Sequence, residues 1–153
     1  MFFRGVTNLN LDAKGRMSFP ARYRERLIDG SGGRLVVTID INRDPCLRVY
    51  PMTAWVEIEK QVMSMSSAKE SVRKFQRLFV GNASECEMDG NGRILLPQRL
   101  RQFACLDKKV VLVGQGERFE LWDEEKWNEQ QEALMSGDDD FQLPSELESL
   151  PSL

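Results

Sequence analysis

Histidine is missing from this sequence of 153 residues, and cysteine is scarce. The absence of histidine removes the commonest general base near neutral pH, Ser-His and Cys-His nucleophilic catalysis, and zinc sites of the usual Cys/His kinds. The three cysteines, an odd number without a C-x-x-C pair, are expected to be small buried hydrophobic residues in a reducing compartment: Cys46, Cys86 and Cys105. With no metal cluster and no nucleophile-base pair to name, the sequence predicts neither an enzyme nor a bound metal or cofactor.

A long apolar run is missing as well, since no stretch approaches the roughly 18 residues that a membrane span needs. The start of the chain, residues 1–5, lacks the basic region and the apolar stretch of a signal peptide. Hydrophobic residues make up 41% of the chain and charged residues 29%, which is typical of a globular domain that buries a core. We therefore expect a cytoplasmic protein without a membrane partner.

Charge is unevenly distributed along the chain, although the net charge is only −3. Residues 1–101 hold 17 Lys and Arg against 11 Asp and Glu, whereas residues 102–153 hold 4 against 13. A basic front and an acidic back are typical of nucleic-acid contact or of an acidic tail. Residues 136–153, rich in Asp, Glu, Ser and Pro, are predicted to form a disordered acidic tail.

One short motif occurs twice, 77 positions apart: Asp12-Ala-Lys-Gly-Arg16, followed by Pro20, and Asp89-Gly-Asn-Gly-Arg93, followed by Pro97. An Asp at the start of a tight turn can accept hydrogen bonds from the backbone ahead of it, a Gly supplies positive φ, and a Pro suits the beginning of a helix. Each copy therefore predicts a strand, a turn, a return strand and a helix. Only the Arg is a residue type that this local structure does not require.

The repeat extends over a whole folding unit of a β-hairpin, a short helix and two further strands. Repeat one covers about residues 5–55 and repeat two about residues 82–127. A unit of about 45 residues is too small to be comfortably stable alone, and two units that close on one another would share a core and cover sheet edges. We therefore expect residues 1–135 to form one pseudo-symmetric, barrel-like α+β domain.

Helices are predicted outside this barrel. Residues 53–80 connect the two repeats and carry an apolar stripe at spacings of three and four: Trp55, Ile58, Val62 and Met65. Ser67-Ala-Lys-Glu70 has the pattern of a capping box that would begin a second helix. A last helix is expected over about residues 123–135.

The two motif arginines are the first candidates for a functional role. A surface ion pair between Arg16 and Asp12, or between Arg93 and Asp89, would contribute little to stability, so stability gives little reason to place the same Arg twice. A two-stranded β-ribbon can enter the major groove of DNA, where Arg can contact O6 and N7 of guanine. The Asp would then orient the guanidinium group. A purely structural ion pair stays open as the alternative.

Further basic residues surround the first motif. Arg22, Arg24 and Arg26 recur at every second position of the predicted helix, so Arg22 and Arg26 share a face and Arg24 points elsewhere. Together with Arg4 and Lys14 they would form a basic patch of the kind that positions DNA through its phosphates. A merely solvated helix surface is the alternative.

The two motif regions differ in charge. Residues 4–26 hold six Lys and Arg against two Asp and Glu, whereas residues 81–103, shifted by 77, hold three against three. We call the region around each motif an arm. We predict that the first arm supplies most of the DNA contact, while the second arm mainly completes the barrel and the assembly.

The doubled motif resembles that of the MraZ family of bacterial transcriptional regulators. Four more segments fit the pattern of that family: Tyr23–Leu27, Cys46–Pro51, Gly81–Cys86 and Phe119–Trp122. The resemblance covers residues 1 to about 135. It implies a tandem AbrB-like swapped-hairpin β-barrel with flanking helices, and a repressor that binds short, G-rich direct repeats upstream of its own operon in the cell-division and cell-wall gene cluster.

The resemblance also implies partners and site residues. The Asp-x-x-x-Arg residues of the family correspond to Asp12 and Arg16 and to Asp89 and Arg93. Family members assemble as ring-shaped homo-oligomers, and head-to-tail contacts between subunits would suit sites repeated in one direction. The expected partner is double-stranded DNA at the nucleoid, without a small-molecule substrate. Two other functions stay open: an oligomeric scaffold or protein-binding module whose acidic tail engages a basic partner, and an antitoxin-like AbrB regulator.

Overall fold

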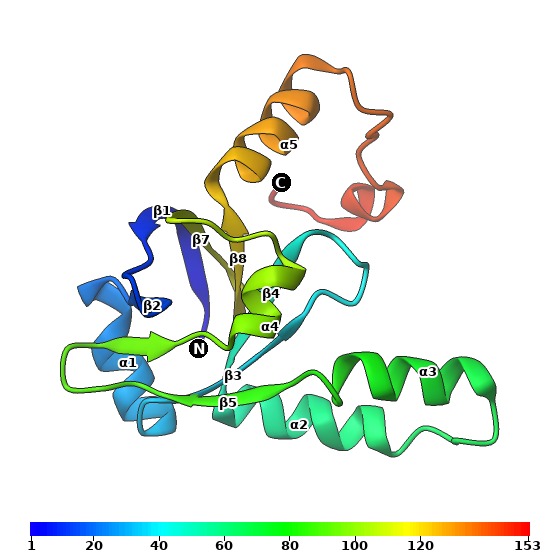
Figure 1. Cartoon of the computed structure of the whole chain (residues 1–153). Helices are drawn as coiled ribbons and strands as arrows, with labels where there is room; N and C mark the ends of the chain where they lie inside the picture. The colour runs from blue at the N-terminus through cyan, green and yellow to red at the C-terminus, as the bar shows by residue number, and fades with distance from the viewer.

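The computed structural model describes residues 1–153 and has the α+β class that the sequence predicts (Figure 1). The strands are β1 (Phe3–Asn10), β2 (Arg16–Ser18), β3 (Arg34–Ile39), β4 (Cys46–Pro51), β5 (Ser84–Glu87), β6 (Arg93–Leu95), β7 (Lys109–Gly116) and β8 (Arg118–Asp123). The helices are α1 (Ala21–Ser31), α2 (Met52–Met63), α3 (Glu70–Phe79), α4 (Gln98–Phe103), α5 (Glu124–Ser136) and the 3₁₀ helix η1 (Ser145–Ser149). None of them is long and apolar enough to span a membrane.

The strands interleave the two repeats. Six of them form one sheet in the order β1-β7-β8-β4-β3-β5, and β2 pairs with β6 in a separate two-stranded ribbon. The first strand of each repeat pairs antiparallel with the third strand of the other repeat, since β1 pairs with β7 and β5 with β3. The order ends at β1 and β5, and no backbone ladder joins these two edges into a closed barrel. The two repeats therefore share one six-stranded antiparallel sheet and one two-stranded ribbon.

The strands on either side of each motif turn do not pair with one another, so the predicted β-hairpin within each repeat is wrong on this point. Instead, β1 runs along β7 from Phe3 to Asn10, and the short β2 runs along β6. Pairing between repeats gives β1 a ladder of eight residues, which a return strand of three residues could not supply. It also draws both halves of the chain into one core.

The main core lies between the inner face of the sheet and a layer made of the ribbon, α1 and α4. Its 20 buried residues come from both repeats. Met17 and Ile94 face each other across the ribbon and are almost completely buried, as are Leu27 of α1 and Leu100 of α4. Because side chains alternate along a strand, burial of Met17 and Ile94 leaves their neighbours on the opposite, outward face of the ribbon.

The outer face of the sheet is covered in two patches. Helices α2 and α3 extend antiparallel beyond the sheet (Figure 1), and Trp55, Val62 and Phe79 pack on Val36 and Tyr50. The second patch joins α5 to the sheet through one cluster: Cys46, Val111, Trp122 and Trp127. Burial on both faces explains why β3 is a continuous apolar run rather than an alternating one.

Two helix boundaries differ from the predicted ones. The Gly-rich segment Asp29–Gly33 predicts that the first helix ends near Ile28. Helix α1 instead ends at Ser31, because Gly32 has the left-handed φ of 64° and its amide donates to the carbonyl of Ile28. The capping box does not form: α3 begins at Glu70 without a side-chain cap, and the carbonyl of Ser67 accepts from the guanidinium of Arg73 instead.

Two burial predictions also differ. Met65 lies beyond the end of α2 and is exposed. Cys105 is exposed as well, since it follows α4 in a left-handed turn at the surface, whereas Cys46 and Cys86 are buried as predicted. The C-terminal segment 137–153 contains only η1, and all of its side chains except that of Leu147 are exposed. Disorder of this acidic tail remains a prediction.

Candidate nucleic-acid interface

The two motif turns have the same hydrogen-bond network. In the first, one carboxylate oxygen of Asp12 accepts from the amides of Lys14 and Arg16, both at 2.9 Å, and the other accepts from Arg16 Nε at 2.7 Å. In the second, Asp89 accepts from the amides of Asn91 and Arg93 and from Arg93 Nε, all at 2.9 Å. Each Asp therefore fixes both its turn and the direction of its Arg.

These hydrogen bonds stabilise the charged form of both carboxylates. The pKa of Asp12 falls to about 2, chiefly because its carboxylate accepts from the backbone amide of Arg16. The pKa of Asp89 is lowered by the equivalent amide of Arg93. Both carboxylates are thus ionised at neutral pH. The terminal amino groups of Arg16 and Arg93 make no hydrogen bond within the chain and remain available to a ligand.

The register of the ribbon brings the two arginines to one surface. Arg16 lies opposite Leu95, and Arg93 lies opposite Ser18. All four side chains therefore share the outward face, since the residues between them, Met17 and Ile94, point into the core. The side chains of Arg16 and Arg93 are 29% and 32% exposed. The outward face of the ribbon, defined by these four residues, is a single basic surface built from both repeats.

The side chains of two further arginines contact the motif turn of the other repeat. Arg24 Nε donates to the carbonyl of Phe19 at 2.7 Å, and its side chain lies against Gly92 of the second turn. Arg101 Nε donates to the carbonyl of Leu96 at 3.1 Å, and its guanidinium lies against Gly15 of the first turn. A Cβ at Gly15 would approach Arg101 Cζ to 2.5 Å. These glycines therefore provide space as well as positive φ.

Arg101 was missed by reasoning from the sequence. The signal was present, because Arg101 stands 77 positions after Arg24, the same shift that relates Arg16 to Arg93. The sequence alone does not show which turn Arg101 contacts, because Arg101 belongs to the second repeat but lies against the first turn.

The other predicted site residues are divided between different places. Arg22 and Arg26 share a face of α1, as predicted, and this face meets β1. Arg22 hydrogen-bonds Thr7 and the hydroxyl of Tyr23, and Arg26 donates to the carbonyl of Phe2 and lies 4.6 Å from the ring centroid of Phe3.

The predicted single patch around the first motif is therefore split. Arg4 lies exposed on β1 near Arg22 and Arg26, and its carbonyl accepts from the hydroxyl of Tyr23. Lys14 stays in the first turn, while Arg24 reaches the second. The reason is that contacts between the repeats, rather than closeness in the chain, decide the neighbours of each turn.

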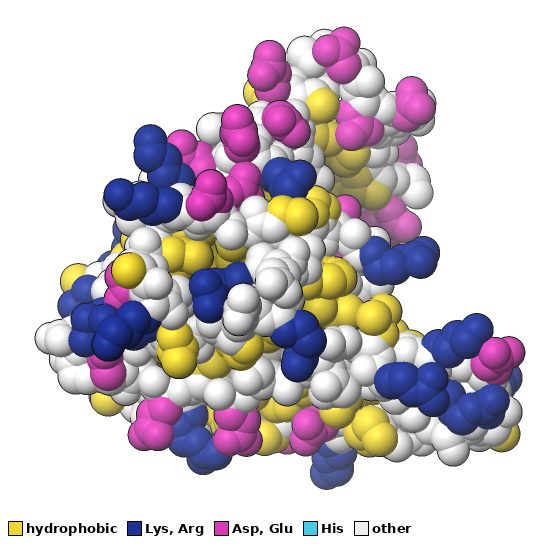
Figure 2. All heavy atoms as spheres, in the orientation of Figure 1, with side chains coloured by type: hydrophobic (Ala, Val, Ile, Leu, Met, Phe, Trp, Pro, Cys, Tyr) yellow, Lys and Arg dark blue, Asp and Glu magenta, His cyan; other side chains and the backbone are white.

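The uneven charge of the sequence is visible on the surface. Figure 2 shows Asp and Glu gathered over α5 and the C-terminal tail, at the top of the view. Lys and Arg gather on the left of the molecule and toward the far end of α2 and α3. The acidic back of the chain is thus separated in space from most of its basic residues.

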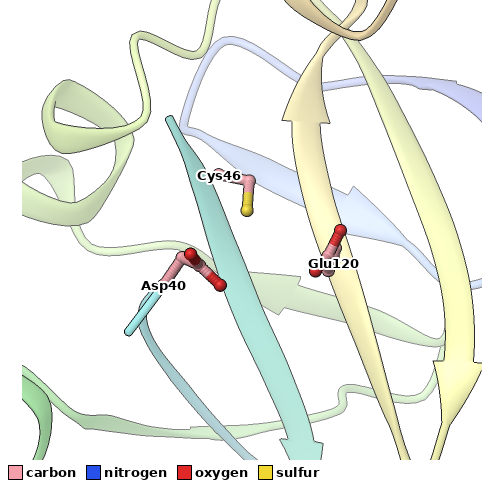
Figure 3. Close-up of side chains that lie close together, drawn as sticks. All are labelled: Asp40, Cys46 and Glu120. Carbon is pink, nitrogen blue, oxygen red and sulfur yellow. The ribbon is translucent and has the colours of Figure 1, made fainter. Parts of the chain in front are cut away.

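One group of side chains has a composition that could suit a metal ion. Candidate ligand atoms of Asp40, Cys46 and Glu120 lie within 4.8 Å of one another (Figure 3). However, buried Asp40 already accepts from Arg48 Nε at 2.9 Å, and Glu120 accepts from the indole of Trp122. Burial also raises the pKa of the Cys46 thiol, which disfavours the thiolate that a metal requires. The ion pair with Arg48 accounts for this arrangement, and we assign no metal to it.

Comparison with known proteins agrees with the two repeats. A family model described as "MraZ protein, putative antitoxin-like" matches residues 2–78 and again residues 79–143. The chain is 56% identical over 149 residues to the transcriptional regulator MraZ of Thioalkalivibrio sulfidiphilus, with 97% of this chain and 98% of that protein covered.

Other relatives carry the same name. The chain is 53% identical over 146 residues to the transcriptional regulator MraZ of Nitrosospira multiformis, which covers 95% of this chain and 97% of that protein. It is 49% identical over 149 residues to that of Pseudomonas aeruginosa, with 97% and 98% covered. The two successive matches and the near full-length identities lead to one conclusion: this chain belongs to the MraZ family of transcriptional regulators.

Proposed function

We propose that this chain is a sequence-specific DNA-binding repressor that reads DNA with the outward face of the β2–β6 ribbon. One observation carries the proposal: Arg16 and Arg93, from different repeats, lie on the same exposed face, and each is held through Nε by an Asp. This arrangement leaves their terminal amino groups free to contact a guanine.

The size and shape of the ribbon support this role. The major groove of B-DNA is about 12 Å wide and admits a two-stranded β-ribbon. Ser18 and the exposed Leu95 lie beside the arginines on the same face, and they would offer a hydroxyl and an apolar contact to neighbouring bases. Because Asp12 and Asp89 orient the arginines before DNA arrives, less side-chain freedom is lost on binding.

The proposed targets are short, G-rich direct repeats upstream of the operon in the cell-division and cell-wall gene cluster, as the family resemblance implies. A ring-shaped homo-oligomer fits such sites, because head-to-tail contacts repeat in one direction. The protein would act in the cytoplasm at the nucleoid. We also propose that residues 1–135 form the tandem AbrB-like swapped-hairpin barrel. Support comes from the pairing of the first strand of each repeat with the third strand of the other.

The two arms are proposed to contribute unequally. Their Asp-Arg geometry is nearly the same, but the first turn holds Lys14 where the second holds Asn91. A lysine beside the groove adds a phosphate contact that an asparagine amide replaces only weakly. The first arm would therefore supply more of the affinity.

Fluorescence anisotropy with the upstream DNA and a shuffled duplex of the same length, at several salt concentrations, tests the function. A sequence-specific DNA-binding protein should prefer the upstream duplex. Its log affinity should fall linearly with log salt concentration, and each neutralised phosphate should contribute about 0.9 to the slope. Equal binding of both duplexes, or no binding, would instead favour an oligomeric scaffold whose acidic tail engages a basic protein.

The family description favours a second candidate, an antitoxin-like regulator that binds DNA and also neutralises a partner protein. The native mass of the chain purified from its own host separates the two. A repressor alone should give a whole multiple of 17.6 kDa, whereas an antitoxin should carry an additional chain.

A further inference from the structure

We propose that the first motif turn and the second repeat together form a composite binding site for DNA backbone phosphate, in which Arg101 and Lys108 hold the strand while Arg16 contacts a base. This inference rests on the proposed function and adds to it two residues that the motif does not contain. It names the DNA backbone as their partner.

Arg101 is prepared for such a contact. Its Nε donates to the carbonyl of Leu96, which fixes the side chain, and its guanidinium lies against Gly15. The two terminal amino groups make no hydrogen bond within the chain. A half-buried guanidinium held by one nitrogen, with two others free, has lost part of its freedom in advance and can bind an anion at less entropic cost.

Lys108 is fixed beside the same turn through the backbone. The amide of Leu11 donates to the carbonyl of Lys108 at 2.7 Å, and the carbonyl of Gly15 accepts from the amide of Leu96 at 3.1 Å. An open hollow is lined by three residues of the first turn and three charged residues of the second repeat: Asp12, Ala13, Gly15, Arg101, Asp107 and Lys108. The second repeat thus contributes two cations next to the arm of the first.

The charge around this hollow favours an anion. The residues that line it carry two positive charges, from Arg101 and Lys108, and two negative ones, from Asp12 and Asp107. Asp12 is already paired with Arg16, so the remaining cations outnumber the one remaining carboxylate. Phosphate contacts fix the register of a protein on DNA, which is the role that a cation beside the reading arm would have.

The second turn has only half of this site. Arg24 lies against Gly92 as Arg101 lies against Gly15, but Gly33 takes the place of Lys108: the amide of Met88 donates to the carbonyl of Gly33 just as that of Leu11 donates to Lys108. Because each turn is accompanied by side chains of the other repeat, the first turn has Arg101 and Lys108 of the second repeat beside it. The inequality of the arms therefore has a structural cause beyond Lys14.

The test compares Arg101→Ala and Lys108→Ala with Arg99→Ala in the full-length protein. Arg99 is an exposed residue of α4, two positions from Arg101, so its loss removes the same charge from the same helix. Binding to the upstream and shuffled duplexes is measured by anisotropy across salt. Arg101→Ala and Lys108→Ala should each reduce the slope of log affinity against log salt concentration by about 0.9, and each should weaken binding to both duplexes by the same factor. Arg99→Ala should leave this slope unchanged.

A slope for Arg101→Ala equal to that of Arg99→Ala, or a loss confined to the upstream duplex, would overturn the inference. Thermal unfolding checks the fold of each variant. Should Arg101→Ala unfold, Lys108→Ala and Arg101→Lys decide the matter. Arg101→Lys keeps the charge and should keep the slope, and a reduced slope would count against a phosphate contact. Wild-type protein that binds no duplex would refute the proposed function itself, which separates the two failures.

Discussion

Replacement of Arg16 by Ala is expected to weaken recognition of the upstream DNA while leaving the fold intact. The substitution removes one guanidinium from the outward face of the ribbon and leaves the buried neighbour Met17 in place. The ion pair with Asp12 is open to solvent, and exposed pairs of this kind contribute little to folding stability. The melting temperature should therefore change little.

The loss in binding should be much larger than the loss in stability. A bidentate arginine contact with guanine supplies about 1–3 kcal/mol of discrimination, which corresponds to a weakening of roughly 5- to 150-fold at the upstream site. Binding to a shuffled duplex should weaken much less, because phosphate contacts dominate there.

Fluorescence anisotropy with both duplexes, combined with thermal unfolding, measures these quantities. Arg93→Ala is the matched variant, since Arg93 has an equivalent Asp partner in Asp89, equivalent hydrogen bonds and similar exposure. We expect a smaller loss for Arg93→Ala. Equal losses for both variants would refute the inequality of the arms. An equal loss on both duplexes would refute base reading by Arg16.

Three further predictions concern stability, and the last of them also concerns DNA binding. The folded-state pKa of Asp12 is about 2, below its ordinary 3.8, so the ionised carboxylate stabilises the fold above about pH 4 and this contribution is lost as the pH falls toward 2. In acid unfolding, the free energy of unfolding should therefore fall less over this window for Asp12→Asn than for wild type. Phe119→Ala should cost about 3–5 kcal/mol in chemical denaturation, since this fully buried ring packs on Phe3 with centroids 4.3 Å apart; a loss below about 1 kcal/mol would contradict the described core. Deletion of residues 138–153 should leave the melting temperature unchanged because nearly all of their side chains are exposed, and it should tighten DNA binding at low salt by removing acidic charge; a drop of several degrees would show that the tail is part of the fold.

The motif turns and the starts of two helices could be predicted from the sequence, because their causes are local. The Asp-x-x-Gly-Arg pattern gave both turns, and the prolines gave the starts of α1 at Ala21 and α4 at Gln98. These two helix starts are 77 residues apart, as the repeat predicts. Charge alternation on α1 also placed Arg24 on a different face from Arg22 and Arg26.

The strand partners could not be predicted in the same way. Alternation of apolar and polar residues shows which face of a strand is buried, but not which strand lies beside it. The sequence therefore suggested a hairpin within each repeat, whereas β1 pairs with β7 and β2 with β6.

Arg101 escaped prediction for the same reason. Closeness in the sequence assigns Arg101 to the second motif, whereas in the fold it lies against Gly15 of the first turn. Only the strand exchange shows that each turn is accompanied by an arginine that is distant in sequence.

Substitution of 7-deazaguanine for guanine in the upstream repeats tests the central claim most directly. This base keeps Watson–Crick pairing but lacks N7, one of the two acceptors that arginine contacts in the major groove. Wild-type protein should bind the substituted duplex more weakly, and Arg16→Ala should bind the substituted and natural duplexes equally. An unchanged affinity of the wild type, or the same loss in Arg16→Ala, would contradict guanine reading by the outward face of the ribbon.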